Sequence, residues 1–244
     1  MDKRLQSLLL INGNTTATLT ERLRRRACAF LGDSWLVSAE TARFGFPYVT
    51  RRIEVTVSAH AVLETANMAA EAGRSFDACL LACFGEPGIA AVREASPAPV
   101  VGMAEASVLC ALQVGRRYGI VTVGEHWPAM IEEYLQGLSL FERCVGIIPV
   151  SGHALDLAAD RSVALNQISI ATERALGLGA DSVIIGGAAI AGFAQDLQST
   201  FRVPLIDSLD AGLAQVEALS RLRLEKPLSK ITLQTLSITT DQRN

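Results

Sequence analysis

Long hydrophobic runs are missing from this sequence, although half of its 244 residues are hydrophobic. The apolar stretch at 8–11 is too short for a signal-peptide core or a bilayer span, and Asn12 interrupts it. We therefore expect no leader, no membrane partner and a cytoplasmic location. A net charge of −3 supplies no strong field of either sign, which argues against a general nucleic-acid partner.

Cysteines in metal-type pairs are also missing. The five cysteines are an odd number, and only Cys79 and Cys83 lie close together in the sequence. On a strand, a spacing of four puts both side chains on one face rather than around a metal ion. We expect free thiols in a reducing compartment, and no metal site.

No Gly-x-Gly-x-x-Gly motif follows the first apolar segment, which argues against a Rossmann dehydrogenase. The chain instead alternates short apolar runs with helical patterns. Predicted strands cover 7–11, 35–39, 78–82, 100–103, 118–124 with its turn, 145–150, 181–187 and 203–206. Predicted helices cover 19–31, 54–73, 89–95, 104–114, 127–137, 157–176, 188–197 and 207–222, and the segment 225–244 has no clear pattern. This order predicts an α/β fold with parallel sheets covered by helices on both faces.

The segment Asp77–Gly88 is the most informative stretch. An apolar run leads to Cys83, where the strand ends, and a turn-forming cluster then opens a helix. Open α/β sheets bind ligands beyond the carboxyl ends of their strands. Amides at a helix start attract anions and can lower the pKa of a thiol. Cys83 is therefore either a functional thiol or a small buried hydrophobic residue.

Two other segments carry polar groups at strand or helix ends. Asn12–Thr16 places two side-chain amides and two hydroxyls after the first strand, and its alternative role is ordinary turn and cap chemistry. Arg51 and Arg52 precede a long helix, where an arginine fork could grip a carboxylate. The alternative for this pair is a solvated helix start.

The chain contains a similar unit twice. The segment Asp77–Cys83 resembles Asp181–Gly187, with an offset of 181 − 77 = 104. Two such lobes would face each other about a pseudo-twofold axis, with the carboxyl ends of both sheets at one cleft. In this arrangement Gly187 is the counterpart of Cys83.

These residues resemble the aspartate/glutamate/hydantoin racemase superfamily, most specifically its hydantoin and allantoin racemase branch. The resemblance lies in four segments that follow the family's order: Ile11–Thr15, Ala82–Gly88, Val101–Ala106 and Val203–Asp207. It implies two Rossmann-like lobes with parallel sheets, an active site in the cleft between them, and no cofactor or metal. We place the first lobe at 1–101 plus 212–244 and the second at 102–211.

The resemblance also implies which residues act. The family uses two cysteines, one per lobe, of which Cys83 would be the first, and the position of the second falls at Gly187. Residues expected to hold the substrate are Asn12, Asn14, Thr15, Phe84, Gly85, Thr122, Val123, Ala188 and Arg52. The activity implied is cofactor-independent racemisation by thiol-mediated proton transfer, at carbon next to a carboxylate or imide carbonyl. The expected partner is a small carboxylate or cyclic ureide, and apolar helix faces lead us to expect a homo-oligomer.

The sequence departs from the family's pattern at Gly187, which cannot act as a second thiol. Glu105 or His126 could serve the second face, although a capping carboxylate and a surface histidine are their plain alternatives. A single thiol is also compatible with decarboxylation or cis–trans isomerisation of a small dicarboxylate. A binding protein that kept the fold and lost turnover is the alternative outside enzymes.

Overall fold

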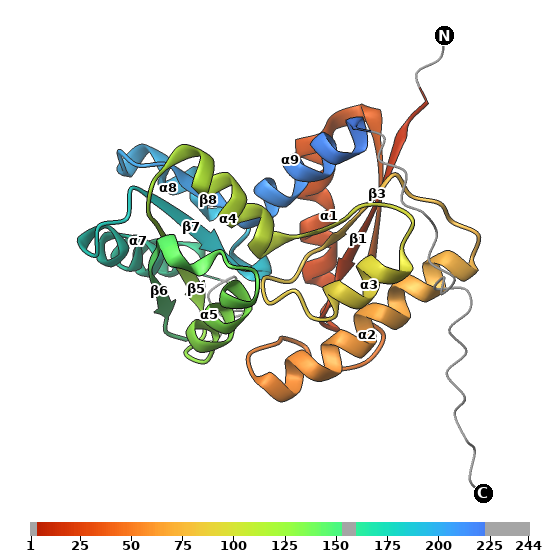
Figure 1. Cartoon of the computed structure of the whole chain (residues 1–244), viewed down its shortest axis with the longest axis horizontal. Helices are drawn as coiled ribbons and strands as arrows, with labels where there is room; N and C mark the ends of the chain where they lie inside the picture. Colours follow the sequence, from red (N-terminus) through yellow and green to blue (C-terminus); the bar gives the residue numbers. More distant parts are fainter. Residues whose placement is uncertain (1–3, 153–159, 223–244) are drawn as a thin grey trace, which may run out of the picture.

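The computed structural model describes residues 4–152 and 160–222, which form two four-stranded parallel sheets (Figure 1). The strand order is β2-β1-β3-β4 in the first sheet and β6-β5-β7-β8 in the second. The strands are β1 Gln6–Asn12, β2 Trp35–Thr41, β3 Ala78–Leu81, β4 Val100–Gly102, β5 Tyr118–Val123, β6 Cys144–Val150, β7 Ser182–Gly186 and β8 Leu205–Asp207. The predicted α/β class with two parallel-sheet lobes is confirmed.

Helices cover both faces of each sheet. They are α1 Ala17–Leu31, α2 Arg52–Glu71, α3 Ile89–Ala95, α4 Met103–Val114, α5 Trp127–Gly137, α7 Arg161–Gly177, α8 Phe193–Leu197 and α9 Ser208–Arg221. Along β1, Leu8 and Leu10 belong to the core cluster that contains α1 and α9, while Leu9 and Ile11 belong to the cluster with α2 and α3. Alternate residues therefore point to opposite, equally apolar faces, which is why β1 reads as a continuous apolar run.

The internal repeat is visible in the strand register. Ile11 pairs with Leu81 in the first sheet, and Val121 pairs with Ile185 in the second. Since Leu81 and Ile185 are 104 residues apart (185 − 81 = 104), Cys83 and Gly187 follow equivalent strands at the same distance. The pairing of β3 with β1 and of β7 with β5 thus brings both positions to the carboxyl edges of their sheets.

Two helices join the lobes. Helix α4 follows β4 of the first sheet and packs against β7 of the second, and α9 follows β8 and returns to pack against β3 and β4 (Figure 1). Arg26 of α1 holds α9 through a half-buried ion pair with Asp210, at 2.6 Å. The largest core cluster runs without a break through α1, α4, α5 and α9. The division of the chain into lobes at 101 and 211 stays a prediction.

Several predicted boundaries differ from the structure for local reasons. The predicted helix 188–197 is interrupted, because Gly192 has a φ of 96° and separates a short 3-10 turn, Ala188–Ile190, from α8. Helix α7 begins at Arg161, where the Asp160 side chain accepts a hydrogen bond from the Val163 amide. The predicted start of that helix at 157–159 and the predicted unpatterned segment 225–244 lie outside the described residues.

Candidate functional site

A small hollow lies where the carboxyl ends of the two sheets meet. Its lining comes from both lobes and consists of Asn14, Tyr48, Val49, Cys83, Phe84, Thr122, Trp127, Gly187 and Ala188. Six of the predicted site positions, Asn14, Cys83, Phe84, Thr122, Gly187 and Ala188, are therefore brought together here. The hollow has a volume of about 20 Å³, room for about one water molecule. A substrate therefore enters only if the walls move apart.

Cys83 presents the nucleophilic atom of this site. The residue is 8% exposed and follows β3 by two positions. Burial raises the pKa of the Cys83 thiol to about 11, and the nearby Glu86 carboxylate raises it further, while a hydrogen bond with the Gly85 backbone amide lowers it. The unliganded site therefore holds a thiol at neutral pH, with one backbone donor already in place for a thiolate.

Asn14 is oriented by its own turn. Its Oδ1 accepts hydrogen bonds from Asn12 Nδ2 and from the Thr16 amide, both at 3.0 Å. Since a backbone amide can only donate, the atom that faces Thr16 is the oxygen, which leaves Asn14 Nδ2 as the available donor. Asn12 is fully buried, and its Nδ2 also donates to Thr20 Oγ1 at 2.9 Å. Asn12 thus supports the site from behind rather than lining it.

The second lobe contributes a strand end and a backbone loop. Thr122 is 3% exposed and pairs with Gly186 in the sheet. The Gly187 amide donates to Ser208 Oγ at 3.2 Å, and Gly187 has a φ of 143°. An L side chain at Gly187 would be strained by this backbone conformation even though the nearest atom to an added Cβ is 3.5 Å away.

The two lobes interlock through aromatic rings that lie on glycines. The Phe84 ring of the first lobe covers Gly186, where an added Cβ would be 2.3 Å from the ring. The Trp127 ring of the second lobe covers Gly85, also at 2.3 Å from an added Cβ. Both glycines are therefore required by the close approach of a ring from the other lobe, which fixes how the walls of the hollow face each other.

A buried carboxylate ties the Cys83 loop to the second lobe. Glu86 is 3% exposed, and its Oε1 accepts from the amides of Ala104 and Glu105, at 2.5 and 2.9 Å, while its Oε2 accepts from the Tyr134 hydroxyl of α5. The pKa of Glu86 is raised to about 7, because burial raises it by more than these hydrogen bonds lower it. Gly102 makes room for the carboxylate, since an added Cβ would be 2.1 Å from it.

Three predicted ligands flank the hollow without lining it. Thr15 donates its amide to the Phe46 carbonyl at 3.0 Å, Gly85 lies under Trp127, and Val123 faces the core cluster of α7 and α8. They shape the walls through backbone or packing. The sequence pattern placed them correctly at strand ends but could not tell which side chains turn toward the cleft.

Arg52 and both alternative second acids lie elsewhere. Arg52 is an exposed residue that forms a bidentate ion pair with Glu133 of α5, at 2.5 and 2.6 Å, so its predicted role as a substrate ligand is not supported by its position. Glu105 is paired with Arg93 at 2.6 Å, and His126 is exposed. Neither side chain is among those that line the hollow.

Sequence reasoning missed Tyr48 and Trp127. Trp127 could have been found, because it follows the carboxyl end of β5 at the start of a helix, as Phe84 follows β3. Tyr48 lies in the loop between β2 and α2, and no periodicity marks it. Its ring contacts core clusters of both lobes, a tertiary feature that leaves no local signal.

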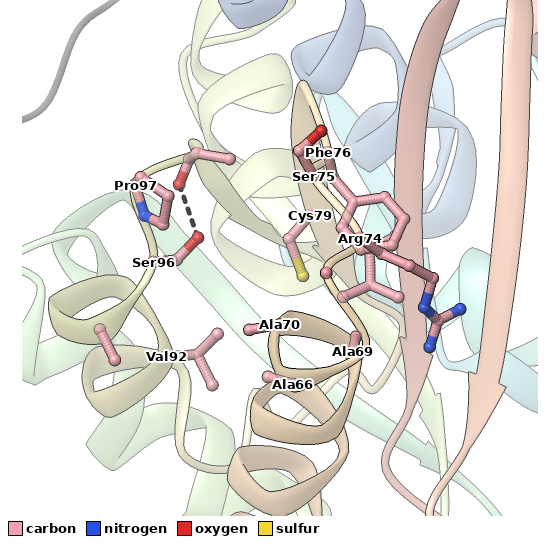
Figure 2. A pocket seen from close by; sticks show the side chains of 14 residues that line it. Ala66, Ala69, Ala70, Arg74, Ser75, Phe76, Cys79, Val92, Ser96 and Pro97 are labelled. Carbon is pink, nitrogen blue, oxygen red and sulfur yellow. Dashed lines mark hydrogen bonds between the residues drawn. The ribbon is translucent and has the colours of Figure 1, made fainter. Parts of the chain in front are cut away.

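A larger apolar cavity lies elsewhere in the first lobe (Figure 2). It has a volume of about 330 Å³ and is lined by small apolar residues of α2 and α3 together with the segments 73–76 and 96–98, and the Cys79 sulfur points into it. Burial raises the pKa of Cys79 to about 12, with no opposing donor. This cavity gathers none of the predicted polar ligands, so size alone does not identify the site.

The part of the chain that the structure describes has neither a metal-type cluster nor a membrane-spanning helix. Across 4–152 and 160–222, no cluster of three or more His, Cys, Asp or Glu side chains could hold a metal ion. Within those same ranges, none of the helices has the length and apolar character needed to cross a membrane.

Comparison with known proteins gives a consistent result. A family model described as Asp/Glu/Hydantoin racemase matches residues 8–216. A hydantoin racemase of Pseudomonas sp. (strain NS671) is 29% identical over 223 residues, covering 91% of this chain and 88% of the relative.

Solved structures agree. An allantoin racemase from Klebsiella pneumoniae has a TM-score of 0.86 at 28% identity, covering 98% of this chain and 96% of that one. An allantoin racemase from Pseudomonas fluorescens has the same TM-score and identity, and covers 98% and 100%. An arylmalonate decarboxylase is similar in fold alone, with a TM-score of 0.60 at 17% identity.

Proposed function

Because the chain belongs to the Asp/Glu/hydantoin racemase family, we propose that it racemises a five-membered cyclic ureide, such as a 5-substituted hydantoin or allantoin, with Cys83 as a proton carrier. The chain is a racemase-type enzyme that acts on a small molecule. The choice of a ureide is supported by the hydantoin and allantoin racemases among its relatives. The observation that carries the proposal is the position of the Cys83 sulfur in a hollow shared by both lobes.

The chemistry follows from the ureide itself. The ring carbon next to the imide carbonyl is a weak carbon acid, and removal of its proton leaves charge on the carbonyl oxygen. The Cys83 thiolate takes this proton from one face, and the pair of electrons moves into the enolate. Asn14 Nδ2, the Thr122 hydroxyl and the amides beside Gly187 are the donors that stabilise this charge.

A second candidate is favoured by one observation, the absence of a side chain at Gly187. A site with a single thiol can protonate an enolate on one face after loss of carbon dioxide from a small dicarboxylate. It can also add to a double bond and permit cis–trans isomerisation. Either reaction needs Cys83 and no second thiol.

The test is a racemisation assay with the pure enantiomers of 5-substituted hydantoins and allantoin, followed by chiral chromatography. We expect turnover by the wild-type protein and a loss of at least about 100-fold in Cys83→Ala. Cys79→Ala is the matched control, since Cys79 lies on β3, four residues before Cys83, but lines the apolar cavity, and its turnover should be unchanged. Equal turnover in Cys83→Ala and wild type would refute the assignment, and turnover of malonates alone would favour the second candidate.

A further inference from the structure

We infer that Tyr48 is the second proton carrier of this site, acting on the face of the substrate opposite Cys83, and that Arg22 positions it. The inference rests on the proposed function and extends it to the face that lacks a thiol. In the lining of the hollow, as far as the described residues go, Tyr48 and Cys83 are the two titratable side chains. A racemase that works by proton transfer needs such a group on each face, because inversion removes a proton from one side and adds one to the other.

Tyr48 reaches from one lobe toward the other. Tyr48 belongs to the loop between β2 and α2 of the first lobe. Its ring nevertheless packs against the cluster formed by β5, β6, β7, α7 and α8, which belongs to the second lobe. The side chain thus crosses the cleft from the lobe that carries Cys83 to the lobe that carries Gly187.

The neighbour of Tyr48 beside the second lobe's wall of the cleft is Arg22. Arg22 of α1 donates from Nη2 to the carbonyls of Ala188 and Ala189, at 3.3 and 2.6 Å. The same guanidinium interacts electrostatically with Tyr48, so the phenol lies near the segment that follows Gly187. That segment is where the family's second thiol is expected, and the position of Tyr48 compensates for its absence.

Arg22 also has a second feature that bears on Tyr48, its Nε donor. Its Nε is buried and has no hydrogen-bond partner among the described residues. Such an orphaned donor costs stability unless something compensates for it. After Tyr48 has given up its proton it is a phenolate. The Arg22 guanidinium would stabilise this negative charge.

The ionisation of Tyr48 is coupled to that of Cys83. Burial is the main cause that raises the pKa of Tyr48 above its ordinary value, the charge on Cys83 raises it further, and Arg22 lowers it. At neutral pH both groups are protonated, and because like charges in one pocket oppose each other, loss of the first proton disfavours loss of the second. Arg161 is the other charged group that acts on Arg22. A pair with a single missing proton is the state that racemisation requires.

The reaction can then be written with its atoms in balance. The Cys83 thiolate forms an S–H bond as the C–H bond breaks, and the electron pair enters the enolate. The Tyr48 O–H bond breaks as a new C–H bond forms on the opposite face, and the enolate electrons make that bond. A thiol and a phenolate remain, and the opposite enantiomer is processed by the same steps in reverse. Loss of the proton on the Cys83 thiol to water and uptake of a proton from water by the Tyr48 phenolate restore the starting state.

The test is enantiomer-resolved deuterium incorporation in heavy water, with pure enantiomers of the hydantoin that the wild-type protein turns over fastest. In Tyr48→Phe we expect inversion to fall by at least about 100-fold, because the second face has no donor. We also expect deuterium to enter one enantiomer without inversion, because Cys83 can still remove and return a proton on its own face. Tyr118→Phe is the matched control, since it removes a hydroxyl that donates to the Leu140 carbonyl at 2.7 Å, away from the hollow.

Three results would overturn the inference. Inversion by Tyr48→Phe at the wild-type rate would remove Tyr48 from the reaction. A parallel fall of inversion and of exchange in both enantiomers would show that Tyr48 only maintains the structure. Absence of exchange and inversion in the wild-type protein with every ureide would refute the proposed function and, with it, the role of Tyr48.

Discussion

At the residue scale, the ionisation of Cys83 decides what the thiol can do at neutral pH. Burial holds the pKa at about 11, while the Gly85 amide favours the thiolate. A substrate that excludes water and adds donors near the sulfur would shift this balance. The structure therefore describes a resting state in which the proton to be exchanged is still on the sulfur.

This ionisation predicts the pH dependence of Cys83 alkylation. Because only the thiolate reacts, the rate with iodoacetamide should rise about tenfold per pH unit from pH 7 and level off near pH 11. Peptide-resolved mass spectrometry measures the rate at Cys83. In urea the same peptide should level off near the ordinary thiol pKa of about 8.5. A native plateau below pH 9 would contradict the burial that we describe.

The raised pKa of Glu86 predicts that the free energy of unfolding depends on pH. Its pKa is raised from 4.5 to about 7 in the folded protein, so between these values the folded state holds a proton that the unfolded state has lost. The free energy of unfolding should therefore fall as pH rises through this window, by about 3 kcal/mol from this group. Gln at position 86 does not titrate and keeps an acceptor for the amides of Ala104 and Glu105.

Urea denaturation of wild type and Glu86→Gln at pH 4.5 and pH 8 measures this effect. The difference between the two proteins should shift toward greater relative stability of Glu86→Gln at the higher pH. Tyr118→Phe serves as the control, since it removes a tyrosine hydroxyl that donates to the Leu140 carbonyl and leaves the hydrogen bonds of Glu86 in place. An identical difference at both pH values would show that Glu86 titrates normally.

The residue scale also shows how far sequence reasoning reaches. Cys83 was found because it ends an apolar run at a turn, and Gly187 because its strand repeats that run. Tyr48 was not found, because its packing against the other lobe is a tertiary contact that leaves no local pattern. The ion pair that holds Arg52 outside the hollow could not be predicted for a similar reason, since its partner Glu133 is 81 residues away in the sequence.

At the element scale, a carboxylate caps the start of both α4 and α9, but it comes from a different segment in each case. The amides at the start of α4 are capped by Glu86 from the loop between β3 and α3, whereas those at the start of α9 are capped by Asp207, the residue directly before that helix. Asp207 in turn accepts from the Gly192 amide at 2.5 Å, so it also ties helix to loop. Gly102 and Asp207 are equivalent in the repeat (207 − 102 = 105), and the Glu86 carboxylate fills the space beside Gly102.

The interlocked rings predict the effect of a single methyl group. Gly186→Ala places a Cβ 2.3 Å from the Phe84 ring, and we expect a loss of about 1–3 kcal/mol in the free energy of unfolding, together with lower turnover. Gly137→Ala is the control, because the α5 glycine has no atom near an added Cβ and the change should be neutral or slightly stabilising. Thermal unfolding of both variants tests this. Equal stability of the two would show that the lobes do not interlock as described.

At the scale of the whole molecule, the alternation of strands and helices predicted parallel sheets, and the internal repeat together with the family resemblance predicted two lobes. The strand order and the return of α9 to the first lobe needed the structure, because they depend on contacts between distant segments. The closed hollow is another property of the whole fold, since both lobes supply its walls. Self-association and the cytoplasmic location stay predictions.

In the proposed mechanism, the Cys83 sulfur carries a proton to and from a substrate carbon between the lobes. The most direct measurement is deuterium uptake at the ring carbon of a hydantoin in heavy water, compared between wild type and Cys83→Ser. The account predicts about one deuterium per inversion in wild type and, with an enantiomer that relies on Cys83, no uptake above the uncatalysed rate in the variant. Undiminished uptake in Cys83→Ser with both enantiomers would contradict it.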